Sequence, residues 1–221
     1  MSTINIAIDG PAGAGKSTIA KMVSARLGYI YVDTGALYRT VALYITENNI
    51  PDEDIEKSLE NADVSLRFVD GAQRVFLGDR DVSELIRTPE ISMAASRTSA
   101  IPAVRAYLFE TQQKIARENN ILMDGRDIGT VVLPNADVKI FLTASAEERA
   151  NRRYKELAEK PECPSYDDIL KDIIQRDYQD MHREIAPLKQ ADDAVLVDTT
   201  KLSLDESAEA IVNVIKEKLG K

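Results

Sequence analysis

The segment from Gly10 to Ser17 has the residue types and the spacing of a phosphate-binding loop. It reads GPAGAGKS and matches the pattern G-x-x-x-x-G-K-[ST]. An apolar, β-branched run at 4–8 precedes it and a helical pattern at 18–27 follows it, so that a strand enters the loop and a helix leaves it. Glycines let successive backbone N–H groups point at phosphate oxygens, and the helix N-terminus adds partial positive charge. We therefore predict a nucleoside triphosphate site; the alternative is a glycine-rich turn that matches by chance.

The last two residues of such a loop have separate chemical roles. The Lys16 ammonium reaches the β- and γ-phosphates, and the Ser17 hydroxyl binds Mg²⁺. Asp124 ends an apolar run at 121–124, the position of a carboxylate that holds the metal, usually through water. We therefore predict Mg²⁺ as cofactor, with Ser17 and Asp124 as its protein ligands. The predicted ATP-binding residues are Gly10, Pro11, Ala12, Gly13, Ala14, Gly15, Lys16, Ser17 and Thr18.

Asp124 opens a turn in which two more charged residues follow, Arg126 and Asp127. The carboxyl end of a parallel strand is the edge at which open α/β sheets bind ligands. Two carboxylates flanking an arginine beside apolar strands are costly unless a ligand uses them, so the turn is a candidate site. The alternative is a turn that contains only an internal ion pair.

Arginines recur at helical spacing in the second half of the chain. Arg176, Asp180 and Arg183 follow one another at i, i+4 and i+7, which places them on one stripe of a helix. Charged stripes are usually solvated faces, but cationic stripes stand out in a chain this acidic. Further candidates are Arg149, Arg152 and Arg153, which share a face, and Arg39, one turn into the helix after Asp33. Together they suffice to clamp a second phosphorylated molecule besides ATP.

The composition narrows the class of protein. The chain has 221 residues and a net charge of −9, which argues against non-specific binding to nucleic acid or to an anionic membrane. Its single cysteine, Cys163, allows neither an internal disulfide nor a cysteine cluster for zinc. We see no signal peptide at the N-terminus and no apolar run approaching the roughly 18 residues of a membrane span. The expectation is a cytoplasmic enzyme, and, since no coiled coil or long hydrophobic edge is evident, a monomer.

His182 is the only histidine, and no nucleophilic relay can be built around it, so we interpret it as a solvated helix residue. Phosphoryl transfer to another phosphate needs no such base. A phosphate monoester has a second pKa of about 6 and is therefore largely dianionic and nucleophilic at neutral pH. Transfer to a sugar hydroxyl would need a base within reach of its proton.

Strands and helices alternate along most of the chain. Five short apolar strands alternating with helices predict a parallel sheet covered on both faces. This alternation of strands and helices is interrupted at Val64. Residues 64–69 alternate between apolar and polar, Asp70-Gly71 is a turn signal, and the strand pattern returns at 74–77. This segment predicts a small antiparallel β insertion. The expected strands are 4–8, 29–33, 121–124, 138–142 and 194–197, and the expected helices are 18–27, 37–48, 51–61, 83–99, 102–119, 145–159, 166–184 and one capped by Ser203. The expected caps are Gly28 after the first helix, Thr34 before the second, and a capping box that begins at Ser145.

Four motifs together resemble the bacterial cytidylate kinases. They are IDGPAGAGKS at 8–17, VDTGALYR at 32–39, DGRDIGT at 124–130, and Arg176-Asp177 followed by APL at 186–188. The resemblance covers nearly the whole chain in order, and the second and third motifs are its specific part. It implies a P-loop NTPase-type fold: a parallel five-stranded sheet with helices on both faces, an antiparallel β insertion in a monophosphate-binding domain, and a short lid. The implied boundaries are core at 1–34, 101–151 and 166–221, monophosphate-binding domain at 35–100, and lid at 152–165.

The resemblance also implies an activity and site residues. The activity is transfer of the γ-phosphoryl group of ATP to CMP or dCMP with Mg²⁺. The implied CMP-binding residues are Thr34, Arg39, Ser96, Arg105, Arg126, Asp127, Arg176, Asp180 and Arg183. The implied catalytic residues are Lys16, Arg126, Arg149, Arg152, Arg153 and Arg183. Among the CMP-binding residues, Ser96, Arg105 and Asp127 match positions that recognise cytosine in the family.

Chemistry supports this assignment of the base site. A carboxylate at Asp127 suits the cytosine N4 amine, while Arg105 and Ser96 can donate to its acceptors. Two departures from the family pattern concern other contacts. Ser17 stands where many relatives have threonine. Gln179 stands where an additional arginine is common, so the acceptor phosphate has one cationic contact fewer or receives it from elsewhere in the chain.

Two other readings of the sequence remain open at this point. One is another small-molecule kinase of the same fold, acting for example on adenylate or shikimate. The other is a nucleotide-dependent switch or ATPase acting on a partner protein or nucleic acid. A switch would hydrolyse ATP slowly without a phosphate acceptor, and it would usually need an interaction surface, for which this acidic chain offers no basic stripe outside the site.

Overall fold

The computed structural model of the chain describes residues 3–69, 72–158 and 163–220. The chain divides into two compact units, one of Met1–Thr3 and Ile30–Ile121 and the other of Ile4–Tyr29 and Leu122–Lys221. The strands form a five-stranded sheet with the order β2-β6-β1-β7-β8 and a three-stranded sheet with the order β3-β4-β5. The predicted fold class, a parallel five-stranded sheet with helices plus a small antiparallel sheet, is confirmed.

The unit that contains the phosphate loop is built on parallel strands. Its strands are β1 (Asn5–Asp9), β6 (Ile121–Gly125), β7 (Val138–Thr143) and β8 (Val195–Asp198). β1 pairs with β7 and β7 with β8, both in parallel. Their carboxyl ends, at Asp9, Thr143 and Asp198, therefore lie at one edge of the sheet. The strands are apolar because they are buried, and each buried isoleucine or leucine contributes about 1.5–3 kcal/mol.

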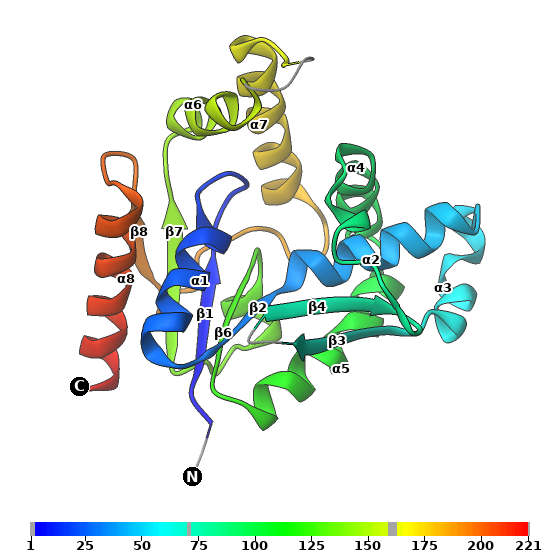
Figure 1. The fold of residues 1–221 in the computed structure, drawn as a ribbon, viewed down its shortest axis with the longest axis horizontal. Helices are drawn as coiled ribbons and strands as arrows, with labels where there is room; N and C mark the ends of the chain where they lie inside the picture. The colour runs from blue at the N-terminus through cyan, green and yellow to red at the C-terminus, as the bar shows by residue number, and fades with distance from the viewer. Residues whose placement is uncertain (1–2, 70–71, 159–162, 221) are drawn as a thin grey trace. The chain divides into compact units, whose positions relative to one another are not determined.

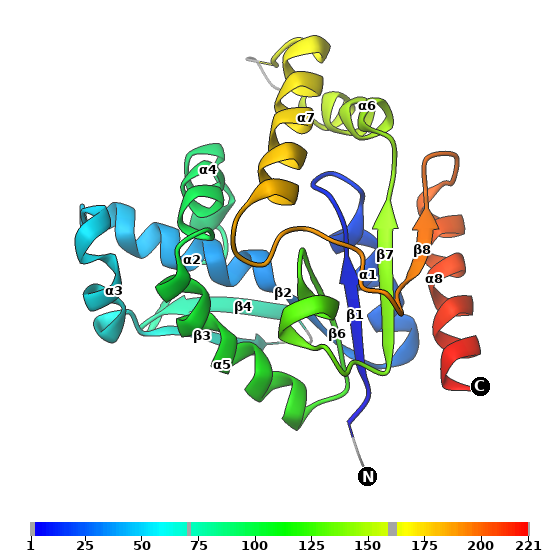
Figure 2. The same ribbon diagram turned by 180° about the vertical axis from the view of Figure 1, so that it is seen from behind.

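The described residues of the same unit include four α-helices. They are α1 (Lys16–Leu27), α6 (Ala146–Leu157), α7 (Tyr166–His182) and α8 (Leu204–Leu219). α8 packs against α1 beside β7 and β8, and α6 and α7 lie side by side (Figures 1 and 2). The predicted C-cap Gly28 is confirmed, with a left-handed backbone that ends α1. The predicted cap Ser203 is confirmed by a complete capping box with Glu206.

Three predicted details in this unit are wrong. α1 begins at Lys16, two residues before the predicted start, because Gly15 adopts the left-handed conformation at its N-cap. The predicted capping box at Ser145 is half formed: the Ser145 hydroxyl accepts from the Glu148 N–H, but the Glu148 carboxylate accepts from Arg152 instead of returning to Ser145. α7 ends at His182, so Arg183 lies beyond the last helical turn with an extended backbone.

The other unit contains the β insertion. Its strands are β2 (Ile30–Asp33), β3 (Val64–Val69), β4 (Ala72–Leu77) and β5 (Arg80–Asp81), and its α-helices are α2 (Thr34–Glu47), α3 (Ile55–Ser58), α4 (Pro89–Thr98) and α5 (Pro102–Glu118). β3, β4 and β5 pair in antiparallel fashion, as predicted. The core of this unit lies between α2, the β insertion, α4 and α5, and includes Leu37, Val75, Ile91 and Leu108. Figure 1 shows α2 running beside β4, with which it is in contact.

Three helix predictions in this unit need correction. The segment predicted as one helix at 83–99 is a 3₁₀ turn, Leu85–Arg87, followed by α4, and Thr88 between them has an extended backbone and is the N-cap of α4. Thr34 was expected to cap a helix that begins at Leu37, but α2 begins at Thr34 itself. Asp33 is the N-cap, and its carboxylate accepts from the Ala36 N–H at 3.0 Å. The segment predicted as one helix at 51–61 is three short pieces, the 3₁₀ turns Asp52–Asp54 and Leu59–Asn61 on either side of α3.

Some predictions fall on residues outside the described ranges. The turn predicted at Asp70-Gly71 lies outside them, as does the part of the predicted lid at 159–162. Along the described residues, no helix is both long enough and apolar enough to cross a membrane.

Candidate active site

The phosphate loop leaves β1 in close contact with the neighbouring strand. Gly10 has a φ of 149°, and a Cβ there would collide with the Leu142 carbonyl oxygen of β7. No residue with a side chain fits this backbone path. Gly15 then sets the left-handed turn from which α1 starts, so the first N–H groups of the helix face the loop. The glycines of the predicted phosphate loop thus adopt backbone conformations that other residues rarely adopt.

Lys16 is buried at the start of α1, with its ammonium group inside the loop. Its Nζ donates to the Pro11 carbonyl oxygen at 2.7 Å. Burial, followed by the positive charge of Arg126, lowers the pKa of Lys16 to about 7. An ammonium that is desolvated and close to another cation favours an anionic ligand, because such a ligand would compensate both effects.

Ser17 and Asp124 lie together at the foot of the loop. The Ser17 hydroxyl donates to an Asp124 carboxylate oxygen at 2.8 Å, and Asp124 is buried at the carboxyl end of β6. A hydroxyl and a carboxylate oxygen are the hard ligands that Mg²⁺ prefers. Among the described residues, no group of three acidic, histidine or cysteine side chains could hold a metal alone. This donor set fits a magnesium ion that takes its other ligands from water and substrate phosphates.

Asp9 organises the turn that follows β6. Its carboxylate accepts from the N–H groups of Ile128 and Gly129 at 2.8 and 2.7 Å. Burial raises the pKa of Asp9 to about 6, against the opposing effect of these two hydrogen bonds. The turn containing Arg126 and Asp127 is therefore held to the end of β1 by a buried carboxylate.

Two ion pairs join that turn to the end of α7. Arg126 Nε donates to Asp180 at 2.9 Å, and an Arg183 Nη donates to Asp127 at 3.4 Å. Both pairs are largely buried. Arg126 and Asp127 of this turn are each paired with a residue more than 50 positions away. Of the predicted stripe on α7, Arg176 is exposed.

Arg149 connects α6, α7 and the phosphate loop. Its guanidinium pairs with both carboxylate oxygens of Asp177, at 3.0 and 2.6 Å. The same group donates to the Ala12 carbonyl oxygen at 3.0 Å and to that of Ala144 at 2.9 Å. The Arg149 side chain is only 5% exposed. In this structure Arg149 contacts the backbone of the loop, with all of these bonds inside one unit.

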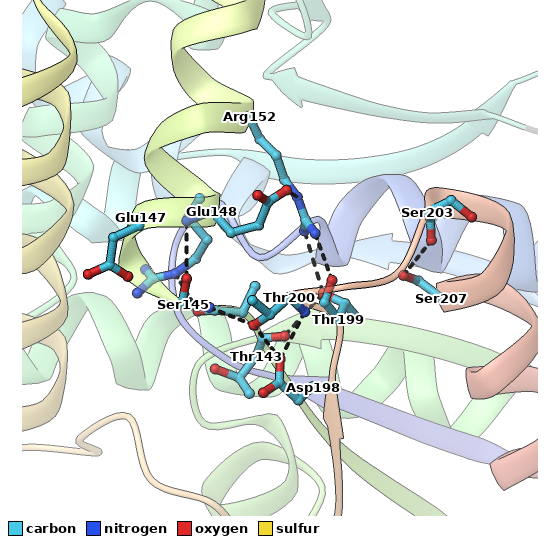
Figure 3. Close-up of polar contacts among 12 residues, drawn as sticks. Thr143, Ser145, Glu147, Glu148, Arg152, Asp198, Thr199, Thr200, Ser203 and Ser207 are labelled. Atoms are coloured by element: carbon cyan, nitrogen blue, oxygen red, sulfur yellow. Dashed lines mark hydrogen bonds and ion pairs between the residues drawn. The ribbon is translucent and has the colours of Figure 1, made fainter.

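The other two arginines of α6 make different contacts. Arg152 Nε donates to Glu148 at 2.9 Å, and its Nη2 donates to the Thr199 carbonyl oxygen at 2.8 Å (Figure 3). Its Nη1 lies 3.8 Å from the place that a Gly15 Cβ would occupy. Arg153 pairs with Glu156 on the exposed surface. Arg152 is thus beside the phosphate loop, whereas Arg153 is on the solvent side of the helix.

The loop after β8 supports the start of α6. The Ser145 N–H donates to the Thr200 hydroxyl, which in turn donates to Asp198 (Figure 3). These bonds from Thr200 hold the pKa of Asp198 below its ordinary value. The Thr199 hydroxyl donates to the Thr143 carbonyl oxygen at 3.1 Å. The carboxyl ends of β7 and β8 are therefore fixed to each other at the level of Arg152.

The unit with the β insertion carries its own group of predicted residues. Arg39 Nη2 pairs with Asp33 at 3.1 Å, while the Arg39 Nε is buried without a hydrogen-bond partner among the described residues. A buried, unpaired guanidinium donor is costly, and an anionic ligand would satisfy it. Thr34 is buried at the start of α2.

The remaining two predicted residues of this unit lie on α4 and α5. Arg105 is buried on α5, donates to the Ser99 carbonyl oxygen at 3.3 Å, and has its guanidinium carbon 5.7 Å from the centre of the Tyr38 ring. Ser96 is half-buried on α4. A buried guanidinium beside an aromatic ring is a setting in which a flat polar group can be recognised.

Comparison with known proteins decides the family. The family model described as cytidylate kinase matches residues 6–217. The chain is 52% identical over 217 residues to a cytidylate kinase of Caldicellulosiruptor bescii, covering 97% of this chain and 96% of the relative. It is 51% identical over 214 residues to a cytidylate kinase of Thermosipho melanesiensis, covering 96% and 97%.

The chain belongs to the cytidylate kinase family. It is therefore an enzyme, a nucleotide-binding kinase with a P-loop fold. Solved structures resemble it more distantly. A shikimate kinase of Bacteroides thetaiotaomicron has a TM-score of 0.52 at 16% identity, covering 99% of each chain. An uncharacterised protein of Eubacterium ventriosum has a TM-score of 0.58 at 12% identity, covering 97% and 99%. At such identities these two neighbours support the fold alone.

In the loop-containing unit, the structure of this cytidylate kinase family member brings Ser17 to Asp124. It also joins Arg126 to Asp180 and Asp127 to Arg183. His182, as predicted, is exposed at the end of α7 and stacks on Tyr178.

Four residues that organise the site are missing from the sequence-based prediction. Asp9 and Asp177 hold predicted residues in the loop-containing unit; in the other unit Asp33 holds Arg39, and Gln73 holds Asp33. Asp9, Asp33 and Asp177 lie within the family motifs, and Asp9 and Asp33 are also carboxylates at the ends of apolar strands. Gln73 carries no such signal, since its partner is distant in sequence.

Proposed function

We propose that this enzyme transfers the γ-phosphoryl group of ATP to CMP and dCMP, forming CDP and dCDP in pyrimidine nucleotide metabolism. The observation that carries the proposal is the family match over residues 6–217 combined with relatives about half identical over nearly their whole length. The structure adds support through a phosphate loop and buried arginines in both units.

The donor side of the proposed reaction belongs to the phosphate loop. Backbone N–H groups within 10–18, Pro11 excepted, are proposed to bind the phosphates of ATP, and Lys16 to contact the β- and γ-phosphates. Ser17 and Asp124 would hold Mg²⁺, which would neutralise charge on the substrate phosphates. Arg149, Arg152 and Arg153 are proposed to offset charge on the transferred group.

The acceptor side is assigned to the phosphate-binding residues that the family resemblance implies. Thr34, Arg39, Arg126 and Arg183 are proposed to bind the phosphate of CMP. Arg176 and Asp180 are assigned to positions near that phosphate and the sugar. Arg126 and Arg183 are held in place by their ion pairs with Asp180 and Asp127. A guanidinium group favours bidentate contact with phosphate.

Cytosine is proposed to be recognised by Ser96, Arg105 and Asp127. The Asp127 carboxylate accepts from the N4 amine, and the other two side chains donate to N3 and O2. Uracil would turn its O4 toward the carboxylate and leave a buried acceptor unpaired, which costs about 1–3 kcal/mol. Selectivity for CMP over UMP follows from this arrangement.

The mechanism that we propose is in-line transfer by positioning and charge neutralisation, without a covalent intermediate. The phosphate of CMP is already nucleophilic, so no general base is required. We further propose that 35–100 forms the monophosphate-binding domain and that 152–165 forms a lid, and that both close over the substrates, because transfer requires exclusion of water. A monomeric state and a cytoplasmic location remain predictions.

A coupled assay of ADP release tests the function. Wild-type enzyme, ATP and Mg²⁺ are combined with CMP, dCMP, UMP, AMP, shikimate or no acceptor. We expect rapid ADP release with CMP and dCMP and only background release without an acceptor. Faster release with AMP or shikimate would indicate a different kinase, and acceptor-independent release as fast as that with CMP would indicate an ATPase.

A further inference from the structure

Gln73 on β4 is bound to the backbone at the end of β2. Its side-chain oxygen accepts from the Asp33 N–H at 2.7 Å, and its side-chain nitrogen donates to the Asp33 carbonyl oxygen at 3.1 Å. The amide thus satisfies both backbone groups of one residue, as a neighbouring strand would. Of the side chains in the β insertion with described contacts, Gln73 is the one bonded to Asp33, the N-cap of α2.

Asp33 in turn holds the beginning of α2. One carboxylate oxygen accepts from the Ala36 N–H at 3.0 Å and the other accepts from Arg39 Nη2 at 3.1 Å. Space there is restricted, since a Cβ at Gly35 would lie 3.0 Å from Arg39 Nη1 and 3.1 Å from the Asp33 carboxylate. The Asp33 side chain cannot shift without moving either the helix cap or the arginine.

One hydrogen-bond donor of the Arg39 guanidinium group is not satisfied by the described residues. Its Nε is buried and has no hydrogen-bond partner among the described residues, although its Nη2 is paired. Such an arrangement fixes the guanidinium through Nη2 and leaves the Nε–H as a donor for an anion. The direction of that N–H depends on Asp33, and the backbone position of Asp33 depends on Gln73.

We infer that Gln73 is a positioning residue for the acceptor phosphate, acting through Asp33 on Arg39. The inference rests on the proposed function, in which Arg39 binds that phosphate. The β insertion then has a function in substrate binding, because the Gln73 amide on β4 fixes the first turn of α2 through Asp33. The side chain must both accept and donate, which glutamine does and which glutamate or leucine does not.

A purely structural role for Gln73 makes a different prediction. If the amide only fastened the insertion to β2, its loss would lower the melting temperature and change the kinetic constants for both substrates little. If it positions Arg39, its loss raises the KM for CMP and leaves the KM for ATP unchanged. The two substrates therefore separate the two roles.

The experiment compares Gln73→Leu and Gln73→Glu with wild type in steady-state kinetics and thermal denaturation. We expect the KM for CMP to rise about tenfold, which corresponds to about 1.4 kcal/mol, with the KM for ATP within about twofold. Gln73→Glu keeps the polarity of the site and serves if the leucine variant does not fold. The matched control is Arg74→Gln, the next residue of β4, whose side chain faces the opposite side of the sheet and pairs with Asp81 at an exposed position. It should leave both KM values unchanged.

A double-mutant cycle with Arg39→Ala separates this inference from the proposed function. We expect Arg39→Ala to raise the KM for CMP and Gln73→Leu to add nothing in that background. If Arg39→Ala raises the KM for CMP but neither Gln73 variant does, the proposed function stands and the inference is overturned. If the Gln73 effect is the same with and without Arg39, the inference is also overturned. If Arg39→Ala leaves CMP kinetics unchanged, the assignment of Arg39 itself fails, and the inference fails with it.

Discussion

Removal of the Asp177 carboxylate should destabilise the enzyme, because it would leave the buried Arg149 guanidinium without its counter-ion. The two side chains are 15% and 5% exposed and form two parallel hydrogen bonds at 3.0 and 2.6 Å. Breaking a buried ion pair by removing one partner costs about 3–5 kcal/mol. The residual exposure of Asp177 places the expected cost at the lower end, about 3 kcal/mol. For a chain of about 150–250 residues, 1 kcal/mol shifts the melting temperature by about 2–4 °C, so Asp177→Ala should melt about 6–12 °C below wild type.

Thermal denaturation of the purified variants measures this directly. The control is Asp172→Ala, which removes an exposed carboxylate from the same helix and should leave the melting temperature close to wild type. Because Arg149 also donates to the Ala12 carbonyl oxygen of the phosphate loop, Asp177→Ala should in addition raise the KM for ATP. Equal melting temperatures for the two variants would refute the reasoning, since the pair would then contribute no more than a surface carboxylate.

Three further predictions follow from the site. The pKa of Lys16 is lowered to about 7, so the unliganded ammonium loses its proton as the pH rises through 7. Binding of polyphosphate favours the charged form, so ATP affinity should fall above pH 7 and binding there should take up a proton. Calorimetry in buffers of different ionisation enthalpy measures this proton uptake. Gly10→Ala should lower the melting temperature and weaken ATP binding in titrations, because a Cβ collides with the Leu142 carbonyl oxygen; unchanged values would contradict this. Arg183→Ala should lower the kcat/KM for CMP by about tenfold or more, because hydrogen bonds to charged groups contribute about 1.5–3 kcal/mol, and should change ATP binding little. Arg117→Ala, at an exposed position, is the control. A defect confined to ATP would contradict the assignment of Arg183.

Local patterns were sufficient to predict the order of the elements and the phosphate loop. The loop motif lies between an apolar strand and a helix, so its context can be identified from neighbouring residues alone. Cap residues were predicted less well. The cap at Ser203 can be predicted because its partner Glu206 is three residues away. The pattern at the second helix favours Thr34 as the cap, but the carboxylate of Asp33 at the strand end forms it.

The contacts that hold the site could not be predicted, because they join residues far apart in the chain. Asp9 binds the backbone at 128–129, and Arg149 pairs with a residue 28 positions away. The sequence indicated arginine-rich helix faces, but it did not indicate which arginine is buried against a carboxylate and which faces solvent. Arg149 and Arg153 lie one turn apart on α6 and differ in this respect.

The relative activity toward CMP and UMP tests the central claim most directly. The wild-type enzyme should phosphorylate CMP with a kcat/KM at least about tenfold above that for UMP, since a preference of about 1.4 kcal/mol corresponds to a factor of ten. Both acceptors would be assayed at the same ATP and Mg²⁺ concentrations through ADP release. Equal kcat/KM values for CMP and UMP would contradict cytosine recognition by Ser96, Arg105 and Asp127.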